Sequence, residues 1–156
     1  MGDYLSVALL GALALLLVSA GIEDARTREI ANWKNAAIAL LAPLWWYATG
    51  LTLWPDMAIQ LGMALLIFAF FAGAFYLNQM GGGDVKLIGA VSLWLPPIPL
   101  IWMLVVMSLV GGALTLVMLI EHRWRRREGP PEIPYGVAIA IAGLLSLREP
   151  IINQLR

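Results

Sequence analysis

The uncharged stretch LIGAVSLWLPPIPLIWMLVVMSLVGGALTLVMLI, residues 87–120, decides the topology of this chain. A transmembrane helix needs about 20 apolar residues, so this stretch is too long for one span and slightly short for two. Pro96, Pro97 and Pro99 interrupt it about a third of the way along, and proline ends helices and favours turns. The sequence therefore predicts a hairpin, with a short helix over 85–95 and a longer helix over 100–120.

The composition indicates that the chain is an integral membrane protein. Of its 156 residues, 61% are hydrophobic and 13% are charged, and the mean hydropathy is +0.82. A soluble domain carries about 25% charged residues, and a small globule cannot bury so many apolar side chains. The apolar runs are continuous rather than alternating, which favours helices. The predicted fold class is an all-α, polytopic membrane helix bundle that forms a single domain over residues 1–156.

Charge distribution sets the number and direction of the spans. Four further apolar runs, 4–22, 36–53, 57–77 and 133–147, bring the predicted count to six. No Lys or Arg precedes residue 4, so the first run is interpreted as a retained span rather than a signal peptide. With six spans, one side holds most of the basic residues: Arg26, Arg28, Lys34, Lys86, Arg123, Arg125, Arg126 and Arg127. The positive-inside rule places that side in the cytoplasm and both termini outside, whereas five spans would violate the rule.

The residue types that the chain lacks exclude several kinds of catalytic and metal-binding site. The chain has no cysteine, and its one histidine, His122, lies among arginines. A disulfide framework, a thiolate metal site, a cysteine nucleophile and a histidine-based triad are therefore excluded or nearly so. We expect neither a metal nor a cofactor.

Two acids lie where the predicted topology brings them to the same end of the bundle. Asp24 follows the first span by two residues, and Asp84 follows Gly81, Gly82 and Gly83 and opens the fourth span. Either acid alone is compatible with helix capping. A cap does not require three glycines, however, and each glycine weakens a helix by up to about 1 kcal/mol. Glycine permits close backbone approach and positive φ, which suits an extended substrate, so Asp84 is a candidate catalytic group.

Two converging carboxyl groups can hydrolyse a peptide bond. Like charges a few ångströms apart share a proton, because ionising both is costly. The ionised member can then take a proton from water while the other protonates the carbonyl oxygen.

These motifs resemble those of the type IV prepilin peptidases, which are GxGD membrane aspartyl proteases. The resemblance covers most of the chain. It is carried by Asp24 with the downstream segment IANW (30–33), by GGGDVKL (81–87), and by IPYGVAIA (133–140) at the last span. Ala31 replaces the proline of the family's I-P-N-type segment, a change that affects the turn but removes no catalytic group. The P-A-L motif of presenilin-type proteases is missing.

The resemblance implies an aspartic endopeptidase that removes a short basic leader from prepilin-like proteins, typically after a glycine. Its location would be the cytoplasmic face of a prokaryotic inner membrane. Asp24 and Asp84 would be catalytic, with Gly81, Gly83, Lys86 and Asn32 as supporting motif residues. The chain lacks the cysteines and the room for the domain of larger, methylating relatives, so methyltransferase activity is not expected. It is similar to the compact enzymes of Flp or tight-adherence pili; archaeal preflagellin peptidases are also compact.

Several roles remain open at this point. Lys86 either influences Asp84 or extends to the lipid headgroups, and Asn32 either orients the loop carrying Asp24 or caps the second span. Arg123, Arg125, Arg126 and Arg127 are predicted to contact anionic lipid, and no nucleic-acid partner is expected. The alternative function is a non-enzymatic small transporter or pilus assembly subunit. Transport predicts ionisable groups near midspan, where Gln60 is the obvious strongly polar side chain.

Overall fold

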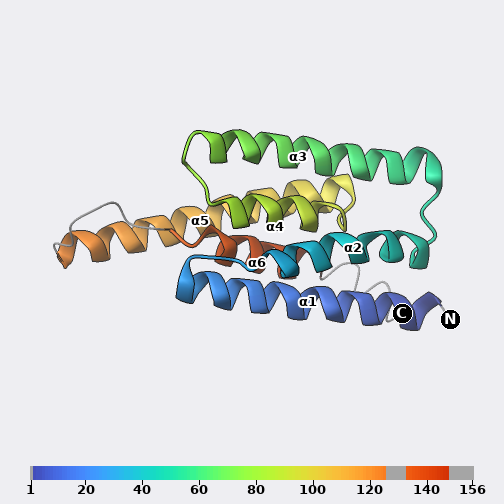
Figure 1. The fold of residues 1–156 in the computed structure, drawn as a ribbon, viewed down its shortest axis with the longest axis horizontal. Coiled ribbons are helices and arrows are strands. Elements are labelled where there is room, and N and C mark those ends of the chain that lie inside the picture. The colour runs from blue at the N-terminus through green and yellow to red at the C-terminus, as the bar shows by residue number, and fades with distance from the viewer. Residues whose placement is uncertain (1, 126–132, 148–156) are drawn as a thin grey trace.

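The computed structural model describes residues 2–125 and 133–147, and this part of the chain is helical (Figure 1). The elements are α1 (Gly2–Thr27), α2 (Asn32–Ala48), the π-helix η1 (Leu53–Met57), α3 (Ala58–Tyr76), α4 (Gly82–Ser92), α5 (Pro97–Trp124) and α6 (Tyr135–Ser146). Six α-helices therefore follow one another in the predicted order, and the predicted all-α bundle is confirmed.

The proline segment forms the predicted break. The helix α4 ends at Ser92, and α5 begins at Pro97, the first helical position, where a missing backbone N–H costs nothing. Pro96 is the N-cap, and its carbonyl accepts a hydrogen bond from the Leu100 N–H at 2.9 Å. A short helix therefore turns into a long one at the prolines.

Helix length and exposure are those of a membrane protein. Three segments, Tyr4–Thr27, Leu53–Tyr76 and Pro97–Trp124, are long and apolar enough to cross a bilayer. Large apolar side chains on α3 and α5 are exposed, including Phe70 (71%) and Leu109 (69%), as expected for surfaces that face lipid. In contrast, α4 has 11 residues, so it extends only about 16 Å against a hydrocarbon core of about 30 Å.

The short helix α4 lies inside the bundle. It packs against α2, α3 and α6, and most of its side chains are buried. At its carboxyl end Trp94 is 1% exposed, donates its indole N–H to the Ile38 carbonyl at 2.9 Å and stacks on Trp45. The nearby Leu93 carbonyl accepts hydrogen bonds from both Trp46 Nε1 (2.7 Å) and Gln60 Nε2 (2.8 Å). These contacts fix α4 against its neighbours.

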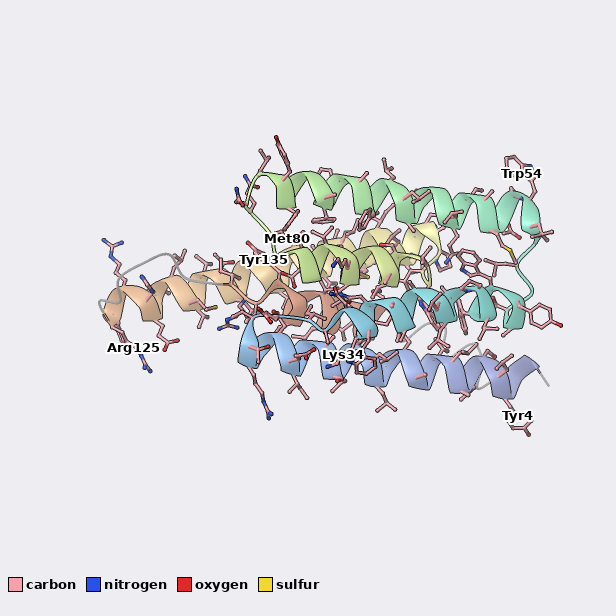
Figure 2. All side chains as sticks on the ribbon, viewed as in Figure 1. Tyr4, Lys34, Trp54, Met80, Arg125 and Tyr135 are labelled. Carbon is pink, nitrogen blue, oxygen red and sulfur yellow. The ribbon has the colours of Figure 1, made fainter. Side chains whose placement is uncertain are left out.

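The helices alternate in direction, so the chain's connections gather at two ends of the bundle. The end of α3 and the starts of α4 and α6 lie at one end, where Figure 2 labels Met80 and Tyr135, while Tyr4 and Trp54 lie at the opposite end. We call the first of these the dyad end, because the predicted pair of acids lies there, with Asp24 near the end of α1 and Asp84 near the start of α4. The helix α5 continues beyond it to Arg125, which pairs with Glu121 at 3.0 Å on the surface. Arg126 and Arg127 lie outside the described residues.

Candidate active site

Asp24 lies in the last turns of α1, and the prediction that it follows the helix in a loop was wrong. Hydropathy marks where the apolar run ends at Ile22, but the helical backbone continues to Thr27. It stops at Arg28, whose φ of 58° is the left-handed conformation that commonly ends a helix. Because it is still helical, Asp24 points back into the bundle and is only 3% exposed.

The Asp24 carboxylate caps the beginning of α6. Its Oδ2 accepts a hydrogen bond from the Val137 backbone N–H at 3.1 Å. The first N–H groups of a helix have no partner within the helix, and the N-cap residue here, Pro134, has no polar side chain to offer them. A carboxylate from α1 therefore supplies the cap, at the end of the helix dipole that favours negative charge.

Asp84 occupies the first turn of α4 and is 7% exposed. Its Oδ2 lies against Gly81, 3.0 Å from the position that a Cβ on Gly81 would take. Asp84 is thus placed near the N-terminus of its own helix, where the helix dipole favours a negative charge. The other oxygen, Oδ1, is buried and accepts no hydrogen bond from any residue that the structure describes. Asp84 therefore has a buried oxygen that is not used in holding the helix start.

The two carboxylates converge at the N-terminus of α6. Gly136 lies against Asp24, since a Cβ added there would be 2.8 Å from the Asp24 Cγ, and its backbone amide is near enough to act on both carboxyl groups. The two side chains are also close enough for the charge of Asp24 to act on Asp84. The structure therefore brings together acids that α1 and α4 contribute separately, around an amide contributed by α6.

The glycines before Asp84 act through close packing rather than through unusual backbone angles. Positive φ at this segment was a wrong expectation, because Gly81 has φ −70° and Gly82 and Gly83 lie inside α4. The expected close approach is present. A Cβ on Gly83 would lie 3.3 Å from the Ile30 Cβ, and one on Gly82 would lie 3.3 Å from the Phe75 ring.

Ile30 occupies the space between two helix starts. Its side chain is 7% exposed and lies against Gly83 of α4 and Gly136 of α6. A Cβ on Gly136 would lie 2.7 Å from the Ile30 Cδ1 and 2.8 Å from the Asp24 Cγ, closer than real contacts allow. Gly136 thus permits the approach of α6 to Asp24.

An ion pair fixes the connection between α1 and α2. Glu23 Oε2 and Lys34 Nζ lie 3.0 Å apart, and the same oxygen accepts the Ala31 N–H at 3.0 Å. Lys34 also donates to the Ser19 carbonyl at 3.1 Å and is buried. Because Glu23 directly precedes Asp24, these contacts help to hold the end of α1 in place.

Lys86 and Asn32 contact each other. Lys86 Nζ donates to Asn32 Oδ1 at 2.8 Å. The N-cap of α2 is Ala31, so Asn32 does not cap that helix. Since residues two apart on a helix point to different faces, Lys86 faces away from the carboxylate of Asp84.

Sequence reasoning missed three residues of this site. Gly136 and Val137 lie within the IPYG segment that was compared with the family's last helix, but no role was predicted for their amides. Asn35 donates from Nδ2 to the Gly83 carbonyl at 3.3 Å, and no signal in the sequence pointed to it. Among the described residues, no group of three or more His, Cys, Asp or Glu is placed to hold a metal ion.

The arrangement is that of two buried carboxyl groups, one of which has an oxygen with no hydrogen-bond partner in the part of the chain that the structure describes. Comparison with known proteins found no match among curated proteins or solved structures. It did find the family model described as "Type IV leader peptidase family", over residues 9–116. This range contains Asp24 and Asp84 and ends within α5. Since the match covers more than half of the chain's 156 residues, the chain belongs to the type IV leader peptidase family.

Proposed function

We propose that this protein is an aspartic endopeptidase in which Asp24 and Asp84 together activate a water molecule. The observation that carries the proposal is that two buried carboxyl groups, from α1 and α4, lie together at the start of α6, where Asp24 accepts the Val137 N–H. Membership of a leader peptidase family gives the reaction class, and the pair gives the chemical groups that perform it. The free Oδ1 of Asp84 supports the same view, because a buried acceptor without a partner costs about 1–3 kcal/mol in a purely structural role.

The reaction follows from a shared proton. The ionised carboxyl group takes a proton from water as the water oxygen bonds to the scissile carbonyl carbon, while the protonated carboxyl group donates to the carbonyl oxygen. Collapse of the tetrahedral intermediate breaks the C–N bond as the proton taken from water passes to the leaving amine, and one hydroxyl of the intermediate returns its proton to the carboxylate that had protonated the carbonyl oxygen. The products are a carboxylic acid and an amine, and the pair returns to its starting protonation. Because the two groups titrate together, neither is assigned as the base.

The substrate is the short basic leader of prepilin-like proteins, cleaved at the cytoplasmic face of a prokaryotic inner membrane. The dyad end carries the basic connections that the positive-inside rule assigns to the cytoplasm. The compact chain is proposed to act only as a peptidase and to contact anionic lipid through Arg123 and Arg125.

Cleavage of a prepilin-like substrate by the purified protein in lipid vesicles tests the proposal. Asp24→Asn and Asp84→Asn, which preserve side-chain size, should each lower kcat by at least about 100-fold. The matched control is Asp56→Asn: Asp56 lies in η1, is exposed and accepts from Thr52 Oγ1 at 2.7 Å. It should cleave at the normal rate. Normal cleavage by either dyad variant, with normal insertion, would refute the proposal.

A further inference from the structure

The two acids of the dyad differ in the hydrogen-bond donors around them. Asp24 Oδ2 accepts the Val137 N–H at 3.1 Å, at the start of a helix, and such a donor favours a negatively charged carboxylate. Asp84 Oδ1 is buried and has no hydrogen-bond partner among the described residues. The surroundings of the pair are therefore asymmetric, although joint titration alone does not assign a role to either acid.

Arg28 adds a positive charge on the side of Asp24. Its backbone ends α1 in the left-handed conformation, and its guanidinium folds back over the last turn of the helix. There Nη1 donates to the Ala25 carbonyl at 3.4 Å and to the Asp24 carbonyl at 3.5 Å. A cation is favoured at this end of a helix, because the last carbonyls and the helix dipole present negative charge. These contacts hold the guanidinium near enough for its charge to act on the Asp24 carboxyl group.

The helices packed against the end of α1 bring no second free cation to Asp24. On α2, Lys34 is already paired with Glu23 at 3.0 Å. The described residues of α6 include one titratable side chain, Tyr135, and no charged one. The guanidinium itself forms no ion pair with an acid in the part of the chain that the structure describes, so its charge is not neutralised elsewhere. Arg28 is therefore the cation that acts on Asp24.

Asp84 has no comparable cation. Lys86, two residues further along α4, faces away from it and donates to Asn32 Oδ1 at 2.8 Å. The charge that acts on Asp84 is that of Asp24, which has the same sign. Ionising Asp84 would leave a buried, negatively charged oxygen without a donor and beside a second carboxylate, which is costly. The shared proton is therefore better placed on Asp84 Oδ1, where it is available to a substrate.

We propose that Arg28 keeps Asp24 ionised, so that Asp24 is the general base and Asp84 the general acid of the proposed peptidase. Asp24 takes a proton from water as the water oxygen bonds to the scissile carbonyl carbon, while Asp84 transfers its Oδ1 proton to the carbonyl oxygen. When the C–N bond breaks, the proton on Asp24 passes to the leaving amine, and a hydroxyl of the intermediate returns a proton to Asp84. Arg28 is a positioning residue that acts through Asp24. This inference rests on the proposed function and divides the roles within it.

The pH dependence of kcat/KM tests the inference, measured in detergent, where both ends of the protein meet the same pH. Arg28→Gln removes the charge and keeps an amide donor for the helix carbonyls. Loss of the cation makes the negative form of Asp24 less stable, so the acid limb should move up by about 1 pH unit and the alkaline limb should move less. Arg28→Lys should restore the wild-type profile. The matched control is Arg26→Gln, at an exposed position of the same helix that points to a different face from Asp24, and it should move neither limb.

A second uncharged variant separates this electrostatic effect from a change in folding. Arg28→Gly suits the φ of 58° at this position, so it should melt at least as high as the wild type and still move the acid limb as Arg28→Gln does. A larger shift of the alkaline limb would exchange the roles of Asp24 and Asp84, and an unchanged profile would mean that Arg28 does not act on the pair. Either result overturns the inference and leaves the dyad intact. Cleavage by Asp24→Asn or Asp84→Asn would instead overturn the proposed function.

Discussion

The Oδ2 of Asp24 accepts a hydrogen bond from the Val137 backbone N–H across 113 positions of sequence. One side chain therefore serves two ends of the chain, as a candidate catalytic group of α1 and as the cap of α6. This contact makes the placement of Asp24 depend on how closely α6 approaches, and the closeness depends on the missing side chain of Gly136.

Gly136→Ala should reduce cleavage by at least about 10-fold. The added methyl group would lie 2.8 Å from the Asp24 carboxyl carbon, so either the carboxylate or the helix start must move, and displacement of a reacting group by about 1 Å is costly. The measurement is kcat in vesicles. Gly112→Ala is the control, because a Cβ there meets nothing within 4 Å, and it should retain full activity.

The double variant Gly136→Ala with Ile30→Val identifies which contact matters. Valine lacks the Cδ1 that would lie 2.7 Å from the new methyl group, but the contact with Asp24 remains. The double variant should therefore stay as slow as Gly136→Ala alone. Recovery to the wild-type rate would show that Ile30, rather than Asp24, carries the effect.

Lys34→Met should lower both thermal stability and cleavage. The substitution leaves the Glu23 carboxylate without its partner at 3.0 Å and removes the bond to the Ser19 carbonyl. Arg125→Met is the matched control, because its pair with Glu121 is exposed and such pairs contribute about 0–1 kcal/mol. Thermal melts in detergent and kcat in vesicles provide the comparison. An equal, negligible shift in both variants would mean that the buried pair does not position α1.

Gln60→Leu should cleave substrate at the wild-type rate. The Gln60 amide donates to the Leu93 carbonyl, which retains its second bond from Trp46 when Gln60 is lost. Its polar group is therefore structural, and a transport role would require it to contact a solute instead. Loss of cleavage in a variant that melts normally would contradict this assignment.

Single introduced cysteines can show which end of the bundle faces the cytoplasm, because the chain contains no cysteine of its own. Glu29 lies between α1 and α2 at the dyad end, and Leu53 lies at the opposite end. Both side chains are exposed, so each position can be replaced by cysteine and labelled. In intact cells, a membrane-impermeant maleimide should label Leu53→Cys and spare Glu29→Cys until the membrane is opened. The reverse pattern would place the dyad outside the cell.

The prolines predicted the break between helices well, because their effect on a helix is the same in any context. Pro96 and Pro97 cannot continue a helix, so the break between α4 and α5 fell where they lie. Hydropathy was less informative about helix ends, because it reports the edge of the apolar run, and α1 continues past Ile22 as a polar helix. The loop predicted around Asp24 was wrong for that reason.

The candidate site was predictable in its acids and not in its surroundings. Asp24 and Asp84 stand out because carboxylates beside apolar spans are costly, and the number of spans places them at one end. Their surroundings are the backbone amide of Val137 and the backbones of Gly136 and Gly81, and every residue type has a backbone amide, so the residue type does not show that it will be used. Asn35 was missed similarly, since its bond to Gly83 depends on how α2 packs against α4.

The cap that Asp24 provides for α6 has a consequence for biosynthesis. Translation completes α1 early, but the amides that complete the surroundings of Asp24 are added only when the ribosome has passed Val137. A nascent chain that has inserted only α1 to α5 already contains both carboxylates, yet it lacks the helix start on which they converge. In the proposed mechanism, proteolytic competence is therefore acquired late in synthesis, when α6 docks against α1.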